Sequence, residues 1–580
     1  MTSGCGRVVI VYNGEVYSHN EIAFDLARTN RRVKGHSDTE IILEACAEWG
    51  VDRVVPRLIG MFAIALYDKE TGELVLVRDR LGIKPVYWSA IDGLLTFGSE
   101  LMPLRQIPGW TPTLDRDAIA SFMRHNYIPA PHTVYKEVHK LEPGTMLKVG
   151  RDGRIKIERY WDLRTIVEKS VREPLAIGDG EAIDRLDALL SDAVKRRLVA
   201  DVPIGSLLSG GIDSSLVTAL MAESAGRKIN SFSIGFADRN FDEAPYAREI
   251  ARHIGTDHTE LYAEASHALD MVEHLPHWYD EPFADSSQLP TALVCEMTRR
   301  HVTVVLSGDG GDELFAGYSR YALALEMLNK ASQASGRLHK ALARRLLAAP
   351  AGLLDRIETS LPARWRKCSL GSRVRQVNAT IFGDDPNVLY RRMLSHWQEP
   401  KELVIGANET KGILWDEDLQ RTVPNFLDRM MLLDALTYLP DDILTKVDRA
   451  SMVVALEARV PLLDHRVVEF SWALPRYMKL RDGVAKWVLR QVLYRRVPRQ
   501  LLGRPKMGFG VPLAEWLRGP LRDWAENHLA KKKLEQQGLF RSRPIRQRWE
   551  AHLSGTNWDY PLWNVLMAQA WIEANPEVSL

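Results

Sequence analysis

A seven-residue stretch rich in glycine and serine constrains the fold of this chain more than any other feature. It reads Ser-Gly-Gly-Ile-Asp-Ser-Ser and covers residues 209–215. The apolar run 202–208 before it predicts a buried strand, and the apolar run 216–221 after it predicts the start of a helix. Glycines let a backbone approach a ligand closely, and a helix N-terminus offers free N–H groups to an anion. The pattern therefore predicts a strand–loop–helix unit that binds phosphate.

Asp213 narrows the kind of anion site that this loop can form. A carboxylate repels phosphate unless a cation lies between them, so the loop predicts phosphate together with magnesium. A Walker A loop is excluded, because no Gly-Lys-Ser/Thr follows the glycines. The loop resembles the PP-loop of ATP pyrophosphatases, which hold the pyrophosphate leaving group while an acid is adenylated. The plainer alternative is a strand–turn–helix corner with a serine N-cap, which requires a much less specific sequence.

A second glycine-rich loop, Ser-Gly-Asp-Gly-Gly-Asp-Glu, covers residues 307–313 and follows the apolar run 302–306. Two parallel strands that both end in Ser-Gly open onto the same crevice at the carboxyl edge of a sheet. We therefore expect Asp213 and Asp312 to face each other across a triphosphate and to hold magnesium. The loop is neither a dinucleotide fingerprint nor an EF-hand. A solvated acidic loop is the alternative interpretation.

The alternation of apolar runs divides the chain into two unlike parts. Before residue 160, short β-type runs and turn residues predict antiparallel sheets, with strands at 7–12, 60–68, 73–78, 86–89, 94–97 and 144–149 and helices at 37–49 and 116–123. After residue 183, strands at 230–236, 257–262 and 302–307 alternate with helices at 183–198, 245–254 and 289–300, which predicts a doubly wound parallel sheet. Beyond Glu313 the pattern is almost entirely helical. The expected domains are 1–165 and 183–580, joined by a linker at 166–182.

Composition excludes several classes of partner. Lys+Arg is 76 against Asp+Glu 75 in 580 residues, so no overall field recruits nucleic acid or an anionic membrane. No apolar run is long enough to span a bilayer, no signal-peptide pattern opens the chain, and the four scattered cysteines suggest neither disulfides nor zinc. A cytoplasmic location is expected. The basic stretch 337–375 is interpreted as a solvated helix face.

Two further segments carry charges in apolar surroundings. Glu457 and Arg459 lie inside the apolar segment 456–463, so we expect them to be paired, either with each other or with a ligand. Lys486 opens an apolar-periodic helix, and a lysine in that place is usually solvated.

The order of these blocks resembles the glutamine-hydrolysing asparagine synthetases of the bacterial type, over nearly the whole chain. The resemblance extends to the N-terminal motifs Asn-Gly-Glu, Ser-Asp-Thr-Glu, Gly-Met-Phe-Ala, Arg-Asp-Arg-Leu-Gly-Ile-Lys-Pro and Phe-Gly-Ser-Glu, at residues 13–15, 37–40, 60–63, 78–85 and 97–100. It implies an α/β fold in which an Ntn-hydrolase-type αββα glutaminase sandwich precedes a PP-loop synthetase domain with a helical C-terminal part. It also implies ATP and magnesium, with aspartate amidated through a β-aspartyl-AMP intermediate and ammonia or glutamine as the nitrogen source. A homodimer is compatible with the sequence.

The resemblance assigns roles to individual residues of the synthetase half. Pyrophosphate would bind to Ser209, Gly210, Gly211, Asp213, Ser214 and Ser215. Leu207 or Leu208 and Ile234 would contact adenine, and Ser307 and Gly308 the nucleotide and intermediate. Asp213 and Asp312 would ligate magnesium. Lys486 and Asp309 would be catalytic, although the family often has glutamate where this chain has Asp309.

In the N-terminal half, the resemblance implies a glutamine pocket. Asn13 and Gly14 would line an oxyanion hole, and Glu15 and Asp38 would hold the α-amino and carboxamide ends of glutamine. Taken alone, Asn13-Gly14 between β runs is a hairpin signal.

The family's glutaminase nucleophile is an N-terminal cysteine whose own α-amine acts as the base. We expect that part of the domain to be missing here. Cys5 is internal, and we interpret it as a structural thiol on the strand that leads into the predicted hairpin. The chain is therefore expected to use ammonia.

Two alternatives to the function that this resemblance implies remain open. Amidotransferases of surface-polysaccharide pathways and β-lactam-forming synthetases share the scaffold but act on other acids. The missing nucleophile also allows a degenerate, non-catalytic paralogue, although both predicted phosphate loops and their aspartates are present.

Overall fold

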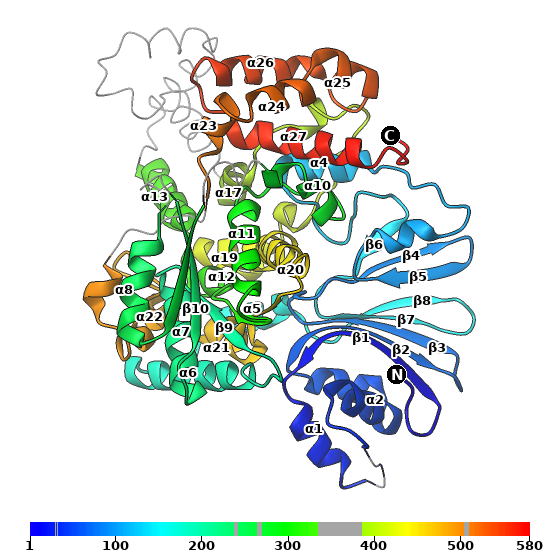
Figure 1. The fold of residues 1–580 in the computed structure, drawn as a ribbon, viewed down its shortest axis with the longest axis vertical. Coiled ribbons are helices and arrows are strands. Elements are labelled where there is room, and N and C mark those ends of the chain that lie inside the picture. The colour runs from blue at the N-terminus through cyan, green and yellow to red at the C-terminus, as the bar shows by residue number, and fades with distance from the viewer. Residues whose placement is uncertain (30, 32, 237–241, 264–269, 334–384, 504–509) are drawn as a thin grey trace.

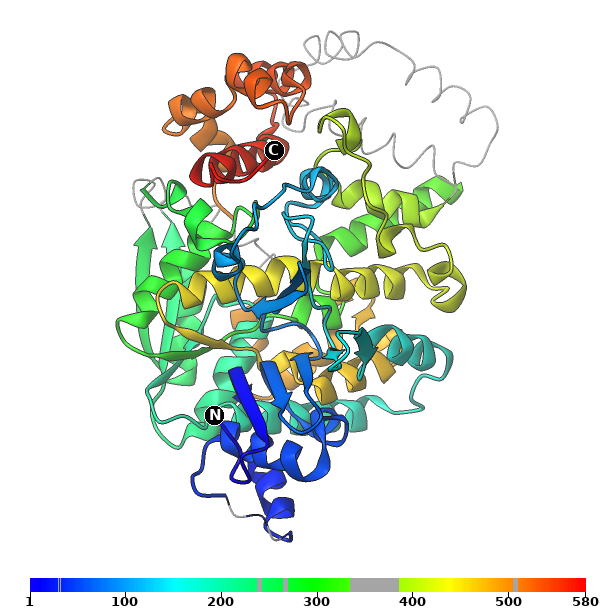
Figure 2. The same cartoon turned by 90° about the vertical axis from the view of Figure 1, so that its right-hand side faces the viewer.

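Two separate sheet systems make up the body of the molecule (Figure 1). The computed structural model describes the chain except for residues 30, 32, 237–241, 264–269, 334–384 and 504–509. The predicted basic stretch 337–375 lies outside the described residues. Along the long axis, helices α1 (His19–Leu26) and α2 (Asp38–Trp49) lie at one end and the C-terminal helices at the other, as Figure 2 shows from the side.

The N-terminal half contains two antiparallel sheets packed face to face. The larger has the order β1-β2-β3-β7-β8 and the smaller the order β5-β4-β6. Their bounds are β1 (Val8–Val16), β2 (Gly60–Asp68), β3 (Glu73–Arg78), β4 (Tyr87–Ile91), β5 (Leu94–Gly98), β6 (Val138–Lys140), β7 (Thr145–Val149) and β8 (Ile155–Arg159). Successive residues of β2 point into two different cores. Phe62 and Ile64 belong to the core that contains residues of α2, whereas Ala63 and Ala65 belong to the core that contains Val86, the residue before β4.

The hairpin predicted at Asn13-Gly14 is wrong. Both residues lie inside β1, where Asn13 pairs with Ala63 and Gly14 with Phe62. A Cβ atom on Gly14 would come within 2.1 Å of the carbonyl oxygen of Met61, and the φ of Gly14 is +140°. The glycine therefore permits a close approach between strands, rather than a turn.

The second sheet is parallel, with the order β11-β10-β9-β12-β13. Its strands are β9 (Ile204–Leu207), β10 (Asn230–Phe236), β11 (Asp257–Ala263), β12 (Val304–Leu306) and β13 (Glu457–Arg459). Both faces are covered, because Val304 and Leu306 belong to the core formed with α6 (Asp179–Arg196) and α7 (Ile212–Ala225), whereas Val305 belongs to the core formed with α11 (Gln288–Arg299). This is the doubly wound arrangement that the sequence predicts.

Helices pack around the sheets of both halves of the chain. Among the described residues they include α3 (Val51–Val54), α4 (Arg116–His125), α5 (Leu163–Arg172), α8 (Ala244–Ile254), α10 (Leu275–Trp278), α12 (Gly311–Leu314), α13 (Ser319–Gln333), α17 (Pro386–Leu394), α18 (Leu419–Thr422), α19 (Phe426–Leu436), α20 (Thr445–Met452), α21 (His465–Ala473) and α22 (Trp487–Tyr494). The last group is α23 (Leu513–Arg518), α24 (Arg522–His528), α25 (Lys531–Gln537), α26 (Ser542–Leu553) and α27 (Asp559–Ala574), and strands β14 (Leu480–Arg481) and β15 (Val484–Ala485) form a small ribbon.

The linker expected at 166–182 is largely helical. Helix α5 runs to Arg172 and α6 begins at Asp179, so the non-helical connection is short. Val167 packs in the core of the parallel-sheet half. The residues between the two domains are therefore part of the packed structure, and the two halves are in close contact.

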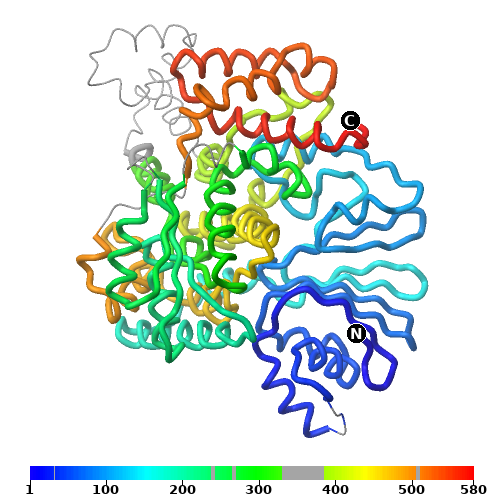
Figure 3. The backbone as a smooth tube through the Cα atoms, viewed as in Figure 1, coloured from blue at the N-terminus to red at the C-terminus, as the bar shows by residue number. Residues whose placement is uncertain are grey.

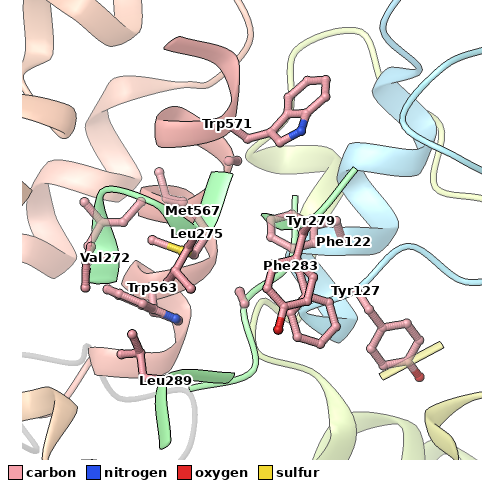
Figure 4. Packing of buried hydrophobic residues seen from close by; sticks show 14 of the residues in the cluster. Phe122, Tyr127, Val272, Leu275, Tyr279, Phe283, Leu289, Trp563, Met567 and Trp571 are labelled. Atoms are coloured by element: carbon pink, nitrogen blue, oxygen red, sulfur yellow. The ribbon is translucent and has the colours of Figure 1, made fainter. Parts of the chain in front are cut away.

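An aromatic core joins the two halves on the side of α27. Figure 4 shows Phe122 and Tyr127, at the end of α4, beside Tyr279 and Phe283 and facing Trp563 and Trp571 of α27. The rings of Tyr279 and Phe283 stack with centroids 4.6 Å apart. The backbone trace in Figure 3 shows α20 lying between the parallel sheet and the N-terminal half. No helix in the described part of the chain is long and apolar enough to cross a membrane.

Candidate functional site

The first glycine-rich loop connects β9 to α7, as the sequence predicts. The hydroxyl of Ser214 lies 3.1 Å from the hydroxyl of Ser209. It also accepts a hydrogen bond of 3.2 Å from the backbone N–H of Ser209. Gly210 has a φ of +75°, and a Cβ atom there would come within 2.9 Å of the backbone nitrogen of Ala247. The loop is thus held tightly against α8, and it places Gly211 as the N-cap of α7.

The second glycine-rich loop lies directly against the first. Strands β9 and β12 are neighbours in the sheet, so both loops leave its carboxyl edge side by side. A Cβ atom on Gly308 would come within 2.6 Å of the backbone nitrogen of Ser214, and one on Gly311 within 2.4 Å of Oδ1 of Asp213. These glycines are required because a side chain would push the loops apart. The prediction that both loops open at the same edge of the sheet is confirmed.

Lys486 lies where the two loops meet, between the two predicted magnesium ligands. Its ammonium group is paired with Asp213 and lies 2.7 Å from Oδ1 of Asp312. Burial opposes the charge, but the carboxylates of Asp213 and Asp312 outweigh it and raise the pKa of Lys486. Only 5% of the residue is exposed, and its backbone is left-handed with a φ of 58°. The solvated-lysine interpretation is therefore wrong, and the strained backbone of Lys486 is typical of a functional position.

The same carboxylates fit a magnesium ion bound through phosphate. Asp213 and Asp312 supply hard oxygen ligands, which Mg²⁺ prefers, and it commonly takes one or two carboxylates together with substrate phosphates and water. Within the described ranges, no group of three or more His, Cys, Asp or Glu forms an all-protein metal cage. A metal at this position would therefore depend on the nucleotide for the rest of its ligands.

Asp309 lies beside this pair on the second loop. Its Oδ2 accepts a hydrogen bond of 2.7 Å from the hydroxyl of Ser307. Burial raises the pKa of Asp309, and the nearby Lys446 partly offsets this effect. Of the other residues that are predicted to contact the nucleotide, Leu207 is half-buried, whereas Leu208, Ser215 and Ile234 are buried.

The predicted pairing of Glu457 and Arg459 is confirmed. Nε of Arg459 lies 2.5 Å from Oε1 of Glu457, and the guanidinium also donates to the carbonyl oxygens of Arg197 and Val199. These bonds fix β13, whose three residues form an edge of the parallel sheet. Arg459 also lies 3.7 Å from Glu15 of the N-terminal half.

The predicted glutamine pocket lies at this contact between the halves. Asn13 donates from Nδ2 to the hydroxyl of Ser99 at 3.1 Å. Burial raises the pKa of Glu15 to about 7, with Arg459 opposing the shift. Asp38 accepts hydrogen bonds from the hydroxyl of Tyr12 and the backbone N–H of Val16, at 2.7 and 3.0 Å. The four predicted residues are therefore on β1 and at the start of α2, with Gly14 packed against β2.

Cys5 does not occupy the position predicted for it. It is exposed and lies in the tight turn 4–6, which connects the segment 1–3 to β1, so it is not a structural core thiol. Hydrogen bonds from Ser3 and Arg31 lower the pKa of Cys5 to about 7. In the described part of the chain Cys46 and Cys295 are also free, and both are buried.

Sequence reasoning assigned no role to a buried charged cluster beside Asp309. Lys446 on α20 donates to Oδ2 of Asp285 at 2.8 Å and to the hydroxyl of Ser287 at 2.7 Å. Asp442, in the π-helical segment Leu439–Leu444 before α20, accepts from Nδ2 of Asn126 at 2.7 Å. The only signal in the sequence was the density of charges among apolar residues in 441–449.

The fold and the two adjoining loops define an α/β nucleotide-binding protein with an amidotransferase-like N-terminal half. The family model described as asparagine synthase matches residues 185–573, and that of the glutamine amidotransferase domain matches residues 1–161. The chain belongs to the asparagine synthase family, whose members are ligases that use ATP as a substrate.

Curated relatives align with this chain over most of their length. Asparagine synthetase [glutamine-hydrolyzing] 1 of Bacillus subtilis is 28% identical and aligns with 98% of this chain and 86% of its own. A putative asparagine synthetase [glutamine-hydrolyzing] of Mycobacterium bovis is 33% identical, over 90% of this chain and 77% of its own. Amidase chyE of Penicillium rubens is 27% identical, over 91% of this chain and 80% of its own.

Proposed function

We propose that this chain amidates L-aspartate to L-asparagine, using ATP and releasing AMP and pyrophosphate. The observation that carries the proposal is the position of Lys486 between Asp213 and Asp312, in the loops that follow two neighbouring parallel strands. Membership of the asparagine synthase family supports the reaction class. In-line attack of a carboxylate on the α-phosphorus needs charge neutralisation and orientation, and it needs no nucleophile from the protein.

Each loop would have a separate task in this reaction. The serines and glycines of 209–215 would bind pyrophosphate, and Ser307 and Gly308 would contact the nucleotide and the acyl-adenylate. Leu207 or Leu208 and Ile234 would border adenine. Magnesium held by Asp213 and Asp312 would neutralise charge on the phosphates.

Lys486 and Asp309 would act on the reacting centre. Lys486 would stabilise negative charge on the phosphates and the intermediate, because it is the cation at the meeting point of the loops. Asp309 would orient ammonia or accept its proton, although its side chain is one methylene shorter than the glutamate frequent in the family. Burial raises the pKa of Asp309 and so favours proton acceptance over permanent ionisation.

The nitrogen source proposed for the chain as given is free ammonia. Asn13, Gly14, Glu15 and Asp38 would retain a glutamine pocket without hydrolysing the amide. A second candidate function is amidation of another carboxylic acid by the same adenylation chemistry, because the relatives include a protein that is not named as an asparagine synthetase.

The test is a pyrophosphate-release screen of candidate acids with ATP, magnesium and ammonium. Activity with aspartate alone, with AMP as the nucleotide product, is the expected result. Activity with a different acid would transfer the proposal to the second candidate. Absence of pyrophosphate release with every acid would support a non-catalytic paralogue.

A further inference from the structure

Strand β8 forms one edge of the larger antiparallel sheet. In the order β1-β2-β3-β7-β8 it pairs with β7 on one side, and among the described residues no strand pairs with it on the other. Figure 1 shows the β7–β8 hairpin extending to the side of the molecule that lies away from the parallel sheet. An unpaired edge presents a row of backbone donors and acceptors to which another strand can add.

The two ends of the hairpin determine which residues of β8 bond to β7. The N–H of Gly150 donates to the carbonyl oxygen of Arg154 at 3.2 Å, and the N–H of Tyr160 donates to that of Gly144 at 3.0 Å. Both pairs continue the register of the two strands. Hydrogen-bonded and non-bonded pairs alternate along an antiparallel ladder, so every second residue between these ends bonds to β7.

The other residues of β8 direct their backbone groups outward. Lys156 and Glu158 are the residues that bond to β7, whereas the N–H and C=O groups of Ile155, Ile157 and Arg159 point away from it. In the described part of the chain no hydrogen bond is made to these outward groups. The side chains of Ile155 and Ile157 are accessible as well, at 39% and 50% exposed. The edge is therefore open to a second strand.

The charges of β8 have opposite signs on the two sides of its central residue. Lys156 and Glu158 flank Ile157, share one face of the strand and form an ion pair of 2.5 Å. In an antiparallel copy of the strand centred on the same isoleucine, each lysine opposes a glutamate. The edge is therefore complementary to itself, which favours a second copy of this chain as its partner.

We propose that β8 is an interface between two copies of this chain, related by a two-fold axis at Ile157. Ile157 then opposes the partner's Ile157, and Ile155 opposes the partner's Arg159. Each of these opposed pairs has outward N–H and C=O groups on both strands, so it exchanges two backbone hydrogen bonds. The two sheets become one continuous sheet, and assembly stops at the dimer because both edges are used.

The side chains support this register on both faces of the joined sheet. Lys156 opposes the partner's Glu158 in a non-hydrogen-bonded position, where facing side chains lie closest and opposite charges stabilise the pair. On the other face, Ile157 meets its symmetry mate, and Ile155 packs along the aliphatic part of the partner's Arg159, so exposed apolar surface is removed from water. A single strand pair is a small interface, so we expect a dissociation constant in the micromolar range.

The opposite edge of the sheet fits a second strand less well. The segment 1–3 covers the start of β1, because the N–H of Ile10 donates to the carbonyl oxygen of Met1 at 2.9 Å and Thr2 forms a bridge with Val9. At the other end of β1, the N–H of Val16 donates to Asp38. Both ends of β1 are therefore occupied, whereas the described structure leaves β8 open along its length.

The proposal is tested by reversing the two charges singly and together. Sedimentation velocity on the full chain should show wild-type protein changing from monomer to dimer as its concentration rises from about 1 to about 100 µM. Lys156→Glu and Glu158→Lys each place like charges opposite one another, so each should raise the dissociation constant about 10- to 100-fold. An equimolar mixture of the two variants restores both attractions, as does the double variant. Both should dimerise with nearly wild-type affinity.

Two further variants separate the interface from general effects of substitution. Lys228→Glu is the matched control, because it reverses a lysine in another exposed ion pair, with Asp257 at the start of β11, and it should leave the dissociation constant unchanged. Ile157→Pro removes the central outward N–H and breaks no bond to β7, so it should give a folded monomer by circular dichroism. If the proline prevents folding, the charge variants still decide the question.

Three results would overturn the interface. They are wild-type protein that stays monomeric at about 100 µM, single charge variants that dimerise as well as wild type, and a mixture of these variants that stays monomeric. The proposed function is independent of this test, because β8 belongs to neither glycine-rich loop.

Discussion

The ammonium group of Lys84 lies 2.8 Å from Oδ1 of Asp448, and this buried pair connects the two halves of the chain. Both side chains are nearly inaccessible, at 5% and 10% exposed. Asp448 belongs to α20, the helix that also carries Lys446 and Arg449. Arg449 donates to the carbonyl oxygen of Ser99, whose hydroxyl is bonded to Asn13. One short helix thus carries the buried Lys446 in its first turn and contacts the predicted glutamine pocket through Arg449.

Loss of Lys84 should therefore destabilise the junction between the halves. Lys84→Met leaves Asp448 buried without its partner, and breaking such a pair typically costs about 3–5 kcal/mol. Denaturant unfolding should show an earlier transition. Lys156→Met is the control, because Lys156 pairs with Glu158 on the surface, where exposed pairs contribute about 0–1 kcal/mol. Equal shifts in the two variants would contradict the importance of the buried pair.

Replacement of Asp213 should stop the chemistry without unfolding the protein. Asp213→Asn keeps the shape of the side chain but removes the charge that holds magnesium, so pyrophosphate release should become undetectable. The wild-type nucleotide product should be AMP, identified by chromatography. Asp257→Asn, at the amino edge of the same sheet, should retain full activity. ADP as the wild-type product would contradict the assignment of the loop.

Lys486 is expected to affect both activity and stability. Lys486→Met should lower amide formation by on the order of a hundredfold or more, the usual effect of losing such an electrostatic contact. It also leaves the carboxylates of Asp213 and Asp312 facing each other, so the melting temperature should fall in metal-free buffer and recover with magnesium. Lys486→Arg should melt near the wild-type temperature. Near-normal turnover of Lys486→Met would assign the residue a structural role.

Glu313 should make stability depend on pH. Burial raises the pKa of Glu313 to about 7, against 4.5 for the free side chain, and the hydroxyl of Tyr318 donates to its carboxyl. As pH rises from about 4.5 to about 7, the unfolded chain releases this proton and the folded chain retains it, so the folded state loses stability. Glu313→Gln should therefore gain about 3 kcal/mol on wild type across this window and nothing below it. Denaturation midpoints of both proteins at about pH 5 and about pH 8 provide the measurement. A pH-independent difference would contradict the shift.

The sequence predicted correctly those elements whose signal lies in residues that are neighbours in the chain. Strand β10 was predicted with its observed bounds, and both glycine-rich loops were predicted at the ends of parallel strands, because apolar runs and glycines act locally. Strand β13 was not predicted, since three residues with two charges carry no strand signal and depend on pairing with β12. The hairpin at Asn13-Gly14 was predicted wrongly for the converse reason, because pairing with β2 overrides the local turn preference.

The charged cluster could not be predicted because its members come together only in three dimensions. Lys446 and Asp285 are 161 positions apart, and Asn126 and Asp442 are 316 apart. Each residue alone is compatible with a solvated side chain. Lys486 shows the same limit, since the local helical pattern favours solvation, and only the approach of two distant loops buries it.

The chain as given should form asparagine with ammonium and release no glutamate from glutamine. An N-terminal-nucleophile glutaminase needs a thiol and its own α-amine at one place. Here Cys5 lies in the exposed turn 4–6, with Ser3 and Arg31 as its contacts. The thiols of Cys46 and Cys295 are buried, which raises the pKa of both to about 12 and leaves them unreactive.

The measurement follows two products in parallel reactions that contain ATP, magnesium and aspartate with either ammonium or glutamine. Asparagine and glutamate are quantified by chromatography, and Cys5→Ser is assayed beside wild type. The ammonium reaction should yield asparagine equally in both proteins, because Cys5 lies in the turn before β1 and belongs to neither loop of the proposed synthetase site. In the contrary outcome, wild-type protein releases glutamate in proportion to asparagine, and the release is lost in Cys5→Ser. That result would contradict the prediction and identify the exposed Cys5 thiol as the glutaminase nucleophile. No glutamate in either protein, with synthesis still supported by ammonium, is the expected result.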